Sequence, residues 1–284
     1  MIGVTGASGH LGRLVIESLL RKVPASEIVA VVRNPEKAAD LASQGVVVRA
    51  GDYSKPETLA AAFAGVDKLL LISGNEVGKR VAQHTAVSAA AKQAGAKLLA
   101  YTSLLHADRS PLLLGEEHRQ SEAAVKASGV PFVLLRNSWY NENYANAVKQ
   151  SVKLGVHYGC AAKGRISAAA RADYAAACAA VLSAEDDPSG RTYELAGDQG
   201  FTLAQFAAEI AKLSGQPVRY EDLSETDYKA VLVKAGLPEA AAGFFANTDA
   251  GISNGALYDD GHQLSRLIGR PTTPISAMIQ AALA

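Results

Sequence analysis

The chain has 284 residues, 49% of them hydrophobic, so it can bury a large core as one domain or two. Lys and Arg number 28 and Asp and Glu also number 28, which leaves no net charge to attract nucleic acid or an anionic membrane. The two cysteines, Cys160 and Cys178, form neither a C-x-x-C motif nor a disulfide framework. They are expected to be small, buried apolar residues.

No signal peptide can be read, because the first predicted strand begins directly after the initiator methionine. The alanine-rich stretch 160–182 is apolar enough to suggest a membrane span. It is interrupted by charged side chains, which are costly in a bilayer, at Lys163, Arg165, Arg171 and Asp173. We therefore expect a cytoplasmic protein that binds neither membrane nor nucleic acid.

The first half alternates short apolar runs with helical patterns, which is typical of βαβ units around a parallel sheet. Strands are predicted at 2–5, 28–32, 46–50, 68–72, 98–101 and 132–135. Helices are predicted at 11–22, 35–44, 55–63, 78–94 and 115–128. The strands are apolar throughout, which predicts helices on both faces of the sheet. The expected fold class is α/β, a doubly wound parallel Rossmann sheet.

The second half differs, because only one strand is predicted there, at 192–195. Helices are predicted at 140–153, 171–183, 224–235, 238–246 and 274–282. Thr202 opens one more helix, since Gln205 completes a capping box. We expect a smaller, mainly helical lobe that covers the substrate. The predicted division places 1–136 and about 168–196 in the Rossmann domain, and about 137–167 and 197–284 in the substrate lobe.

A glycine-rich turn lies between the first predicted strand and the first helix. Gly6, Gly9 and Gly12 follow the spacing G-x-x-G-x-x-G. Glycines let the backbone approach a pyrophosphate closely, and the N–H groups at the start of the helix then bind its charge. The turn predicts a dinucleotide site, and a purely structural turn is the alternative.

Arg33 stands at the end of the second predicted strand, 21 residues after Gly12. NAD-binding proteins carry an acidic residue near this position, where it binds the ribose 2′-hydroxyl. A guanidinium can instead bind a 2′-phosphate, which a carboxylate would repel. NADPH is therefore the expected cofactor, and a solvated arginine at a strand end is the alternative.

Polar residues at the ends of later strands are further candidates, because ligands of open α/β sheets collect at that edge. Asp52 follows the third strand, where it is placed either to bind the adenine amino group or to form a turn. Ser73 and Gly74 follow the fourth strand and are expected to line the ribose region, with a plain turn as the alternative. The fifth strand brings Ser103 to the same edge.

The helix predicted at 115–128 lacks the Tyr-x-x-x-Lys pair that would relay a proton to a carbonyl. Leu114 and His118 have the spacing of that pair, but leucine cannot donate a proton. The acidic residues around this helix, including Glu117 and Glu122, fit a solvated face better than a catalytic carboxylate pair. The histidines lack close metal-ligand spacing, so no metal site is expected.

The segment 137–144 contains the only tryptophan, two tyrosines and three asparagines. Aromatic rings stack on flat ligands, and amides donate hydrogen bonds to ligand oxygens. Asn137, Tyr140 and Asn143 are therefore candidates for positioning an acceptor, and a helix start anchored on core aromatics is the alternative. Arg171 opens a later helix, where it is expected either to pair with a nearby aspartate or to reach the cofactor.

Four sequence blocks, 5–12, 32–35, 101–108 and 135–144, together resemble the NmrA-like branch of the atypical short-chain dehydrogenases. Within it they are most similar to bacterial NADPH-dependent quinone oxidoreductases of the second type, and more distantly to triphenylmethane reductases. Blocks 171–174 and 267–273 extend the resemblance to nearly the whole chain. It implies NADPH contacts at Gly6, Ala7, Ser8, Gly9, His10, Leu11 and Arg33, near Ser73, Gly74 and Asn75, at 137–143 and at Arg171.

The resemblance and the missing proton relay together predict reduction of quinones by direct hydride transfer from NADPH, without flavin. A quinone stacked beneath Trp139 and Tyr140 needs no strong acid, because solvent can protonate the hydroquinone anion. Two alternatives stay open: a non-catalytic, NADP(H)-sensing regulator of the NmrA type, and a reductase of dyes and related conjugated compounds. A homodimer also stays open.

Overall fold

The computed structural model describes residues 1–284, and the chain divides into two compact units. The first unit comprises Met1–Ala107, Glu116–Asn137 and Arg171–Tyr193. The second unit comprises Asp108–Gly115, Ser138–Ala170 and Glu194–Ala284. Its first segment, Asp108–Gly115, lies within the range that the sequence-based division places in the Rossmann domain.

A seven-stranded sheet forms the first unit, in the order β3-β2-β1-β4-β5-β6-β8. Its strands are β1 (Ile2–Thr5), β2 (Ile28–Val32), β3 (Val47–Ala50), β4 (Lys68–Leu71), β5 (Leu98–Leu104), β6 (Phe132–Asn137) and β8 (Thr192–Leu195). All neighbours from β3 to β6 pair in parallel. The strand order reverses between β1 and β4, and doubly wound sheets bind ligands at the carboxyl edge of that point. The predicted Rossmann fold is confirmed.

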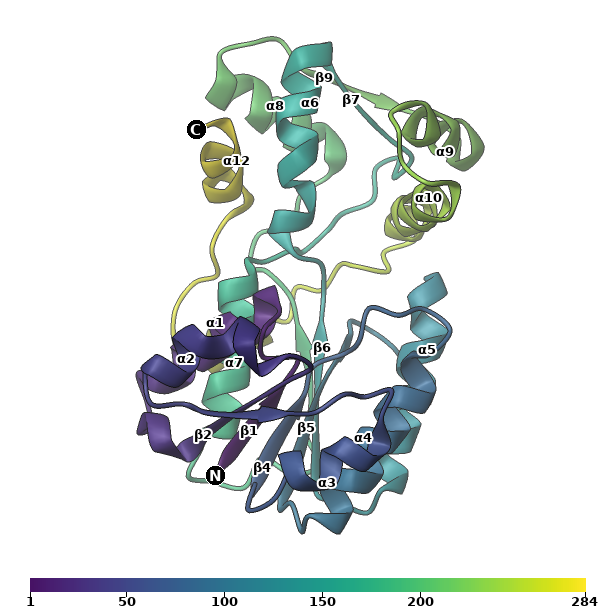
Figure 1. Ribbon diagram of the computed structural model, residues 1–284. Coiled ribbons are helices and arrows are strands. Elements are labelled where there is room, and N and C mark those ends of the chain that lie inside the picture. Colours follow the sequence, from purple (N-terminus) through teal and green to yellow (C-terminus); the bar gives the residue numbers. More distant parts are fainter. The chain divides into compact units, whose positions relative to one another are not determined.

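Helices cover both faces of the sheet, as its uniformly apolar strands predict. Figure 1 shows α1 and α7 on one face and α3, α4 and α5 on the other. The helices of this unit are α1 (His10–Leu20), α2 (Ala39–Ser43), α3 (Leu59–Ala62), α4 (Arg80–Gln93), α5 (Leu113–Ala127) and α7 (Arg171–Leu182). The segments predicted as helices at 35–44 and 55–63 begin as 3-10 turns at Pro35 and Pro56, and become α-helical only afterwards.

The second unit contains six helices and a small sheet. The helices are α6 (Ala145–Leu154), α8 (Leu203–Ser214), α9 (Glu225–Lys234), α10 (Glu239–Ser253), α11 (Gln263–Ile268) and α12 (Ile275–Leu283). Thr202 and Gln205 form the predicted capping box at the start of α8. The strands β7 (Val156–Gly159) and β9 (Arg219–Asp222) pair in parallel, and neither was predicted. Each has only four residues, too few to show a strand-like alternation.

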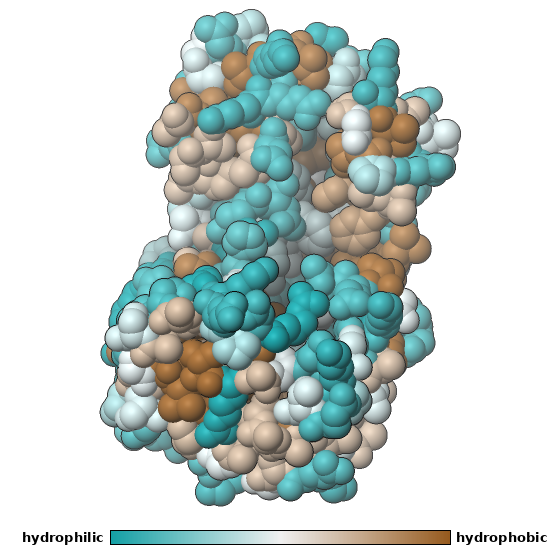
Figure 2. Space-filling view, viewed as in Figure 1, coloured by the Kyte–Doolittle hydropathy of each residue, from teal (hydrophilic) through white to brown (hydrophobic).

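Hydrophilic side chains are spread over both units on the face shown in Figure 2. No helix is both long and apolar enough to cross a membrane. Of the alanine-rich stretch 160–182, only the last 12 residues are helical, as α7, whereas a spanning helix needs about 20.

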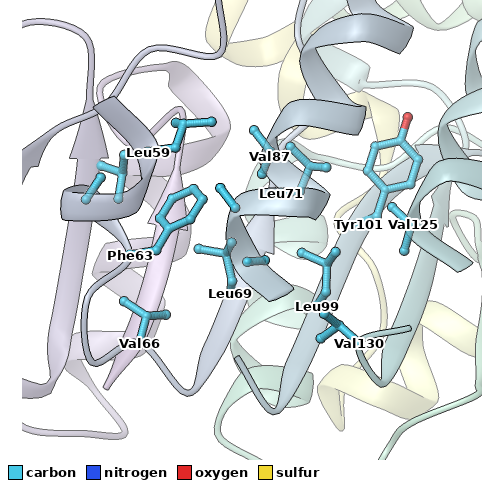
Figure 3. Packing of buried hydrophobic residues seen from close by; sticks show 14 of the residues in the cluster. Leu59, Phe63, Val66, Leu69, Leu71, Val87, Leu99, Tyr101, Val125 and Val130 are labelled. Atoms are coloured by element: carbon cyan, nitrogen blue, oxygen red, sulfur yellow. The ribbon is translucent and has the colours of Figure 1, made fainter. Parts of the chain in front are cut away.

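An apolar cluster fills the space between the sheet and α3, α4 and α5. Figure 3 shows Phe63, Leu69, Leu99 and Val125 packed in this cluster, together with the ring of Tyr101. Each fully buried side chain of this size contributes about 1.5–3 kcal/mol through removal of apolar surface from water. The cluster holds the strands in place, and with them the loops at their carboxyl ends.

Candidate functional site

The three glycines of the β1–α1 turn leave space around one carbonyl oxygen, which belongs to Gly6 itself. Gly6 itself has a φ of 60°, a left-handed conformation that other residues rarely adopt. The Gly9 N–H donates to the Gly6 oxygen at 3.0 Å, and a Cβ on Gly9 would lie 3.2 Å from it. A Cβ on Gly12 would lie only 2.4 Å from the same oxygen. The spacing therefore lets α1 begin directly against the turn.

The start of α1 is open to an anion. Ser8, Gly9 and His10 are exposed, while Ala7 and Leu11 are buried and fix the turn to the core. No side chain caps the helix, and its first turn has no acidic residue. The first N–H groups of a helix lack partners within the helix and carry partial positive charge, so they bind phosphate well. Because His10 is exposed, its size does not disturb the backbone of the turn.

Arg33 follows β2 and extends into solvent, with 73% of its side chain exposed. Its nearest charged partner is Glu76, at 3.8 Å between Nη1 and Oε1. Such a long, exposed ion pair contributes little free energy. Glu76 also pairs with Lys79 at 3.2 Å, and the lysine lowers the pKa of its carboxyl group. The Arg33 guanidinium can therefore exchange its contact with Glu76 for one with a phosphate at a small cost in free energy.

Asp52 forms a local turn, because its carboxylate accepts a hydrogen bond of 2.9 Å from the Ser54 N–H. This contact favours the turn-forming alternative over adenine binding. The neighbouring Tyr53, which the sequence analysis did not single out, connects the strand ends. Its hydroxyl contacts the Thr5 hydroxyl and lies 2.9 Å from the Ile72 carbonyl oxygen. Tyr53 thus joins the ends of β1 and β4, where the strand order reverses.

The loop after β4 carries Ser73, Gly74 and Asn75, which the resemblance places near the cofactor. The Ser73 N–H donates to the Thr102 hydroxyl at 2.9 Å, and the Gly74 N–H donates to His84 at 3.0 Å. Asn75 is exposed. The loop begins beside the glycine turn, since a Cβ on Gly6 would lie 3.6 Å from Ile72. This places the loop next to the anion-binding helix start.

Asn137 ends β6 with an unusual side chain, because it is only 4% exposed and its amide makes no hydrogen bond. Both Oδ1 and Nδ2 lack a partner, whereas its backbone oxygen accepts from the Leu105 N–H at 2.8 Å. A buried polar group without a partner costs about 1–3 kcal/mol. A ligand oxygen or amide could satisfy these atoms, so Asn137 is suited to binding one.

The remaining residues of the aromatic segment belong to the second unit. Trp139 and Tyr140 are half-buried and Asn143 is exposed. The Trp139 ring lies 6.3 Å from that of Phe244 on α10, inclined by 30°. Tyr144 is buried against Phe206, as the core-anchoring alternative predicts. Trp139 and Tyr140 keep part of their surface available to a ligand.

A family model described as NAD(P)H-binding matches residues 6–185, which is more than half of the chain. The chain belongs to this NAD(P)H-binding family. It is 52% identical to quinone oxidoreductase 2 of Escherichia coli strain K12 over 279 residues, 98% of this chain and 97% of the relative. The NAD(P)H-binding assignment confirms the predicted class of cofactor.

Two solved structures resemble the whole NAD(P)H-binding chain. The Escherichia coli NADPH-dependent quinone oxidoreductase complexed with NADPH matches with a TM-score of 0.97 and 51% identity over 100% of both chains. Citrobacter sp. triphenylmethane reductase complexed with NADP(H) matches with a TM-score of 0.95 and 39% identity, covering 99% of this chain and 100% of the other. The resemblance that the sequence blocks indicate is therefore confirmed.

Ser103 of the NAD(P)H-binding unit is tied into a buried ion pair. Its hydroxyl donates to Glu122 at 2.6 Å, and Arg136 binds both oxygens of that carboxylate at 2.8 Å. This contact favours a structural role for Ser103 over a cofactor contact. The prediction of a solvated face is wrong for Glu122, which is 3% exposed. Removing one partner of such a buried pair costs about 3–5 kcal/mol, because the other charge is left unpaired.

His118 does not replace the lysine of the missing proton relay. It is a buried residue of α5, and its Nδ1 lies 2.8 Å from the Tyr101 hydroxyl. Burial and the nearby Arg80 charge lower the pKa of His118 to about 3, so the ring is neutral at pH 7. Leu114 has no polar group, so these two positions supply neither a phenol nor a cation.

Arg171 begins α7 half-buried, and Asp173 is completely buried two residues later. A cofactor contact by Arg171 stays a prediction, as does a pairing with Asp173. No group of three or more His, Cys, Asp or Glu side chains lies close enough to hold a metal ion.

Proposed function

We propose that this chain reduces quinones with NADPH as the direct hydride donor, without flavin. The observation that carries the proposal is the 52% identity to Escherichia coli quinone oxidoreductase 2, which extends over nearly the full length of both chains. The open start of α1 and the exposed Arg33 fit the pyrophosphate and the 2′-phosphate of NADPH. We further propose a cytoplasmic location, and a homodimer stays a prediction.

The proposed reaction requires the protein mainly to hold the nicotinamide and the quinone in the right relative position. NADPH, when bound, supplies a hydride, which carries two electrons and one proton. A quinone that accepts it becomes a hydroquinone anion, and one proton from solvent completes the hydroquinone. No strong acid is required, in agreement with a neutral His118 and an apolar Leu114. Catalysis then depends on proximity and on donors near the oxygen that becomes negative.

Asn137 is the donor that we assign to this oxygen. Its Nδ2 has no partner and its side chain is buried, so it can donate to the quinone oxygen without first losing another hydrogen bond. Trp139 and Tyr140 supply aromatic surface on which a flat ring can stack, and Asn143 supplies an exposed amide. Each of these four residues is proposed separately as a contact of the acceptor.

Reduction of dyes is a second candidate function. It is favoured by the 39% identity to a triphenylmethane reductase over 99% of this chain. Triphenylmethane dyes are conjugated cations that accept a hydride at the central carbon, so the same hydride donor would serve them. The two activities differ in the acceptor and not in the cofactor.

The test is steady-state oxidation of NADPH with 1,4-benzoquinone and, in parallel, with a triphenylmethane dye. We expect acceptor-dependent oxidation well above the uncatalysed rate, and no flavin in the supernatant of the denatured protein. NADPH binding without turnover of any acceptor would contradict the proposal and favour the NADP(H)-sensing alternative. Turnover of the dye but of no quinone would favour the second candidate function.

Substitution of Asn137 by leucine separates its role in activity from its role in stability. We expect kcat with benzoquinone to fall on the order of 100-fold, because a donor to the developing negative charge is lost. The melting temperature should stay unchanged or rise, since leucine removes a buried amide that has no partner. An unchanged kcat in a folded Asn137→Leu protein would show that this amide does not face the acceptor.

A further inference from the structure

One residue in the loop after β4, Gly74, has both its backbone N–H and its backbone carbonyl oxygen bound by side chains of α4. Its N–H donates to His84 Nε2 at 3.0 Å, and its carbonyl oxygen accepts from Arg80 Nε at 2.7 Å. His84 is fully buried and Arg80 is 6% exposed. The later loop residues Asn75 and Val77 are exposed, so the two hydrogen bonds to Gly74 fix a loop that otherwise faces solvent.

The hydrogen bonds around His84 allow a single arrangement of protons. Because Gly74 donates to Nε2, that nitrogen must be unprotonated, and the ring proton must lie on Nδ1. Nδ1 lies 2.8 Å from the Ser121 hydroxyl, which donates its own proton to the Glu117 carbonyl oxygen at 2.7 Å. Burial and the Arg80 charge lower the pKa of His84 to about 3, so Nε2 keeps its lone pair at neutral pH.

A second set of contacts fixes the far end of the same loop. The Gly78 N–H donates to one carboxylate oxygen of Glu117 at 2.7 Å, and Arg80 pairs with the other at 3.2 Å. Arg80 therefore links Gly74 to Glu117 on α5. Side chains of two helices thus hold the loop in the shape that it has beside the glycine turn.

We propose that His84 is a positioning residue that presents the Gly74 peptide, and with it Ser73 and Asn75, to NADPH. The inference rests on the proposed function only in that these loop residues face the nucleotide. His84 itself does not touch the cofactor. It acts through the Gly74 N–H, so its effect should appear in NADPH binding before any acceptor is present.

Two substitutions at position 84 provide a matched pair. In His84→Gln the side-chain amide reaches the position of Nε2, so its oxygen can accept from Gly74. In His84→Asn the shorter amide reaches only the position of Nδ1, so it can contact Ser121 but not Gly74. Both variants lose the ring, but only His84→Asn leaves the Gly74 N–H without its partner, so its melting temperature should fall further than that of His84→Gln.

The dissociation constant for NADPH, measured by fluorescence titration without acceptor, is the decisive quantity. We expect it to rise about tenfold in His84→Asn and to stay near the wild-type value in His84→Gln. Equal affinities in the two variants would overturn the proposal. Because no acceptor is used, failure of quinone reduction would leave this result unaffected.

The tautomer of His84 provides an independent measurement. Long-range proton–nitrogen NMR spectra should show Nδ1 protonated and Nε2 unprotonated at neutral pH, with and without NADPH. Protonation of Nε2 would contradict the proposal, since that nitrogen could then not accept from Gly74.

Discussion

Replacement of Arg33 by alanine is expected to weaken NADPH binding on the order of 30- to 100-fold and to leave NADH binding nearly unchanged. The two cofactors differ only in the 2′-phosphate, and a charged hydrogen bond to such a group contributes about 1.5–3 kcal/mol. In this structure Arg33 has only the 3.8 Å contact with Glu76 to lose, so its removal costs the fold little.

The measurement is a titration of each cofactor against wild type and Arg33→Ala. Arg33→Lys should give an intermediate loss for NADPH, because lysine keeps the charge but not the two-pronged geometry of the guanidinium. Arg21→Ala is a matched control, since Arg21 is an exposed arginine paired with Glu17 near the far end of α1. Equal losses of NADPH and NADH in Arg33→Ala would show that Arg33 does not bind the 2′-phosphate.

Acidification from pH 7 to pH 5 is expected to lower the free energy of unfolding by roughly 4 kcal/mol. Burial lowers the pKa of His84 and His118 to about 3 and that of His157 to about 4, against 6.5 for a free histidine. The unfolded chain therefore binds protons before the folded chain does. Stability is complete above pH 6.5 and is lost as the pH falls towards 3–4, at about 2 kcal/mol per histidine by pH 5.

Protonation of Asp249 partly offsets this loss of folding stability. Burial raises the pKa of its carboxyl group from 3.8 to about 7, so the folded chain binds this proton more readily than the unfolded chain does. Its contribution is complete below pH 3.8 and is lost as the pH rises through 7, which returns roughly 2 kcal/mol on acidification to pH 5. The net loss of about 4 kcal/mol is large beside the usual 5–15 kcal/mol of folding stability.

Urea unfolding at pH 7, 6 and 5 tests both parts of this expectation. Asp249→Asn should increase the loss of unfolding free energy, because it removes the carboxyl group that offsets this loss. His157→Gln should reduce the loss by about 2 kcal/mol, the contribution of one histidine. A free energy of unfolding that is constant between pH 7 and pH 5 in wild type would contradict the burial of neutral histidines.

Features that depend on neighbours in the chain could be predicted from the sequence. The runs Ile2–Thr5 and Ile28–Val32 are continuous apolar segments, and both form strands with the predicted bounds. Gly45, Gly65, Gly95 and Gly129 follow the helices predicted at 35–44, 55–63, 78–94 and 115–128, a placement typical of helix C-terminal caps, and all have positive φ. The glycine turn was recognisable because its three glycines all serve one local requirement, the space around the Gly6 oxygen.

Features that depend on tertiary contacts could not be predicted in this way. Glu122 looked like a surface residue of a polar helix, and only the packing of α5 on the sheet brings Arg136 against it. The hydrogen bond from the Gly74 N–H to His84 also forms only when α4 packs beside the loop. Asn137 was singled out for its residue type, but its missing hydrogen bonds are visible only when its surroundings are in place.

The strand β8 has a consequence for how the protein is made. Its first two residues belong to the first unit, and its last two belong to the second. The first unit thus acquires its final strand only when residue 193 has left the ribosome, after the first two segments of the second unit, Asp108–Gly115 and Ser138–Ala170, have been synthesised. Neither unit corresponds to a continuous stretch of the gene. A chain truncated before residue 193 lacks part of both units, so such fragments should not yield a separately folded nucleotide-binding module.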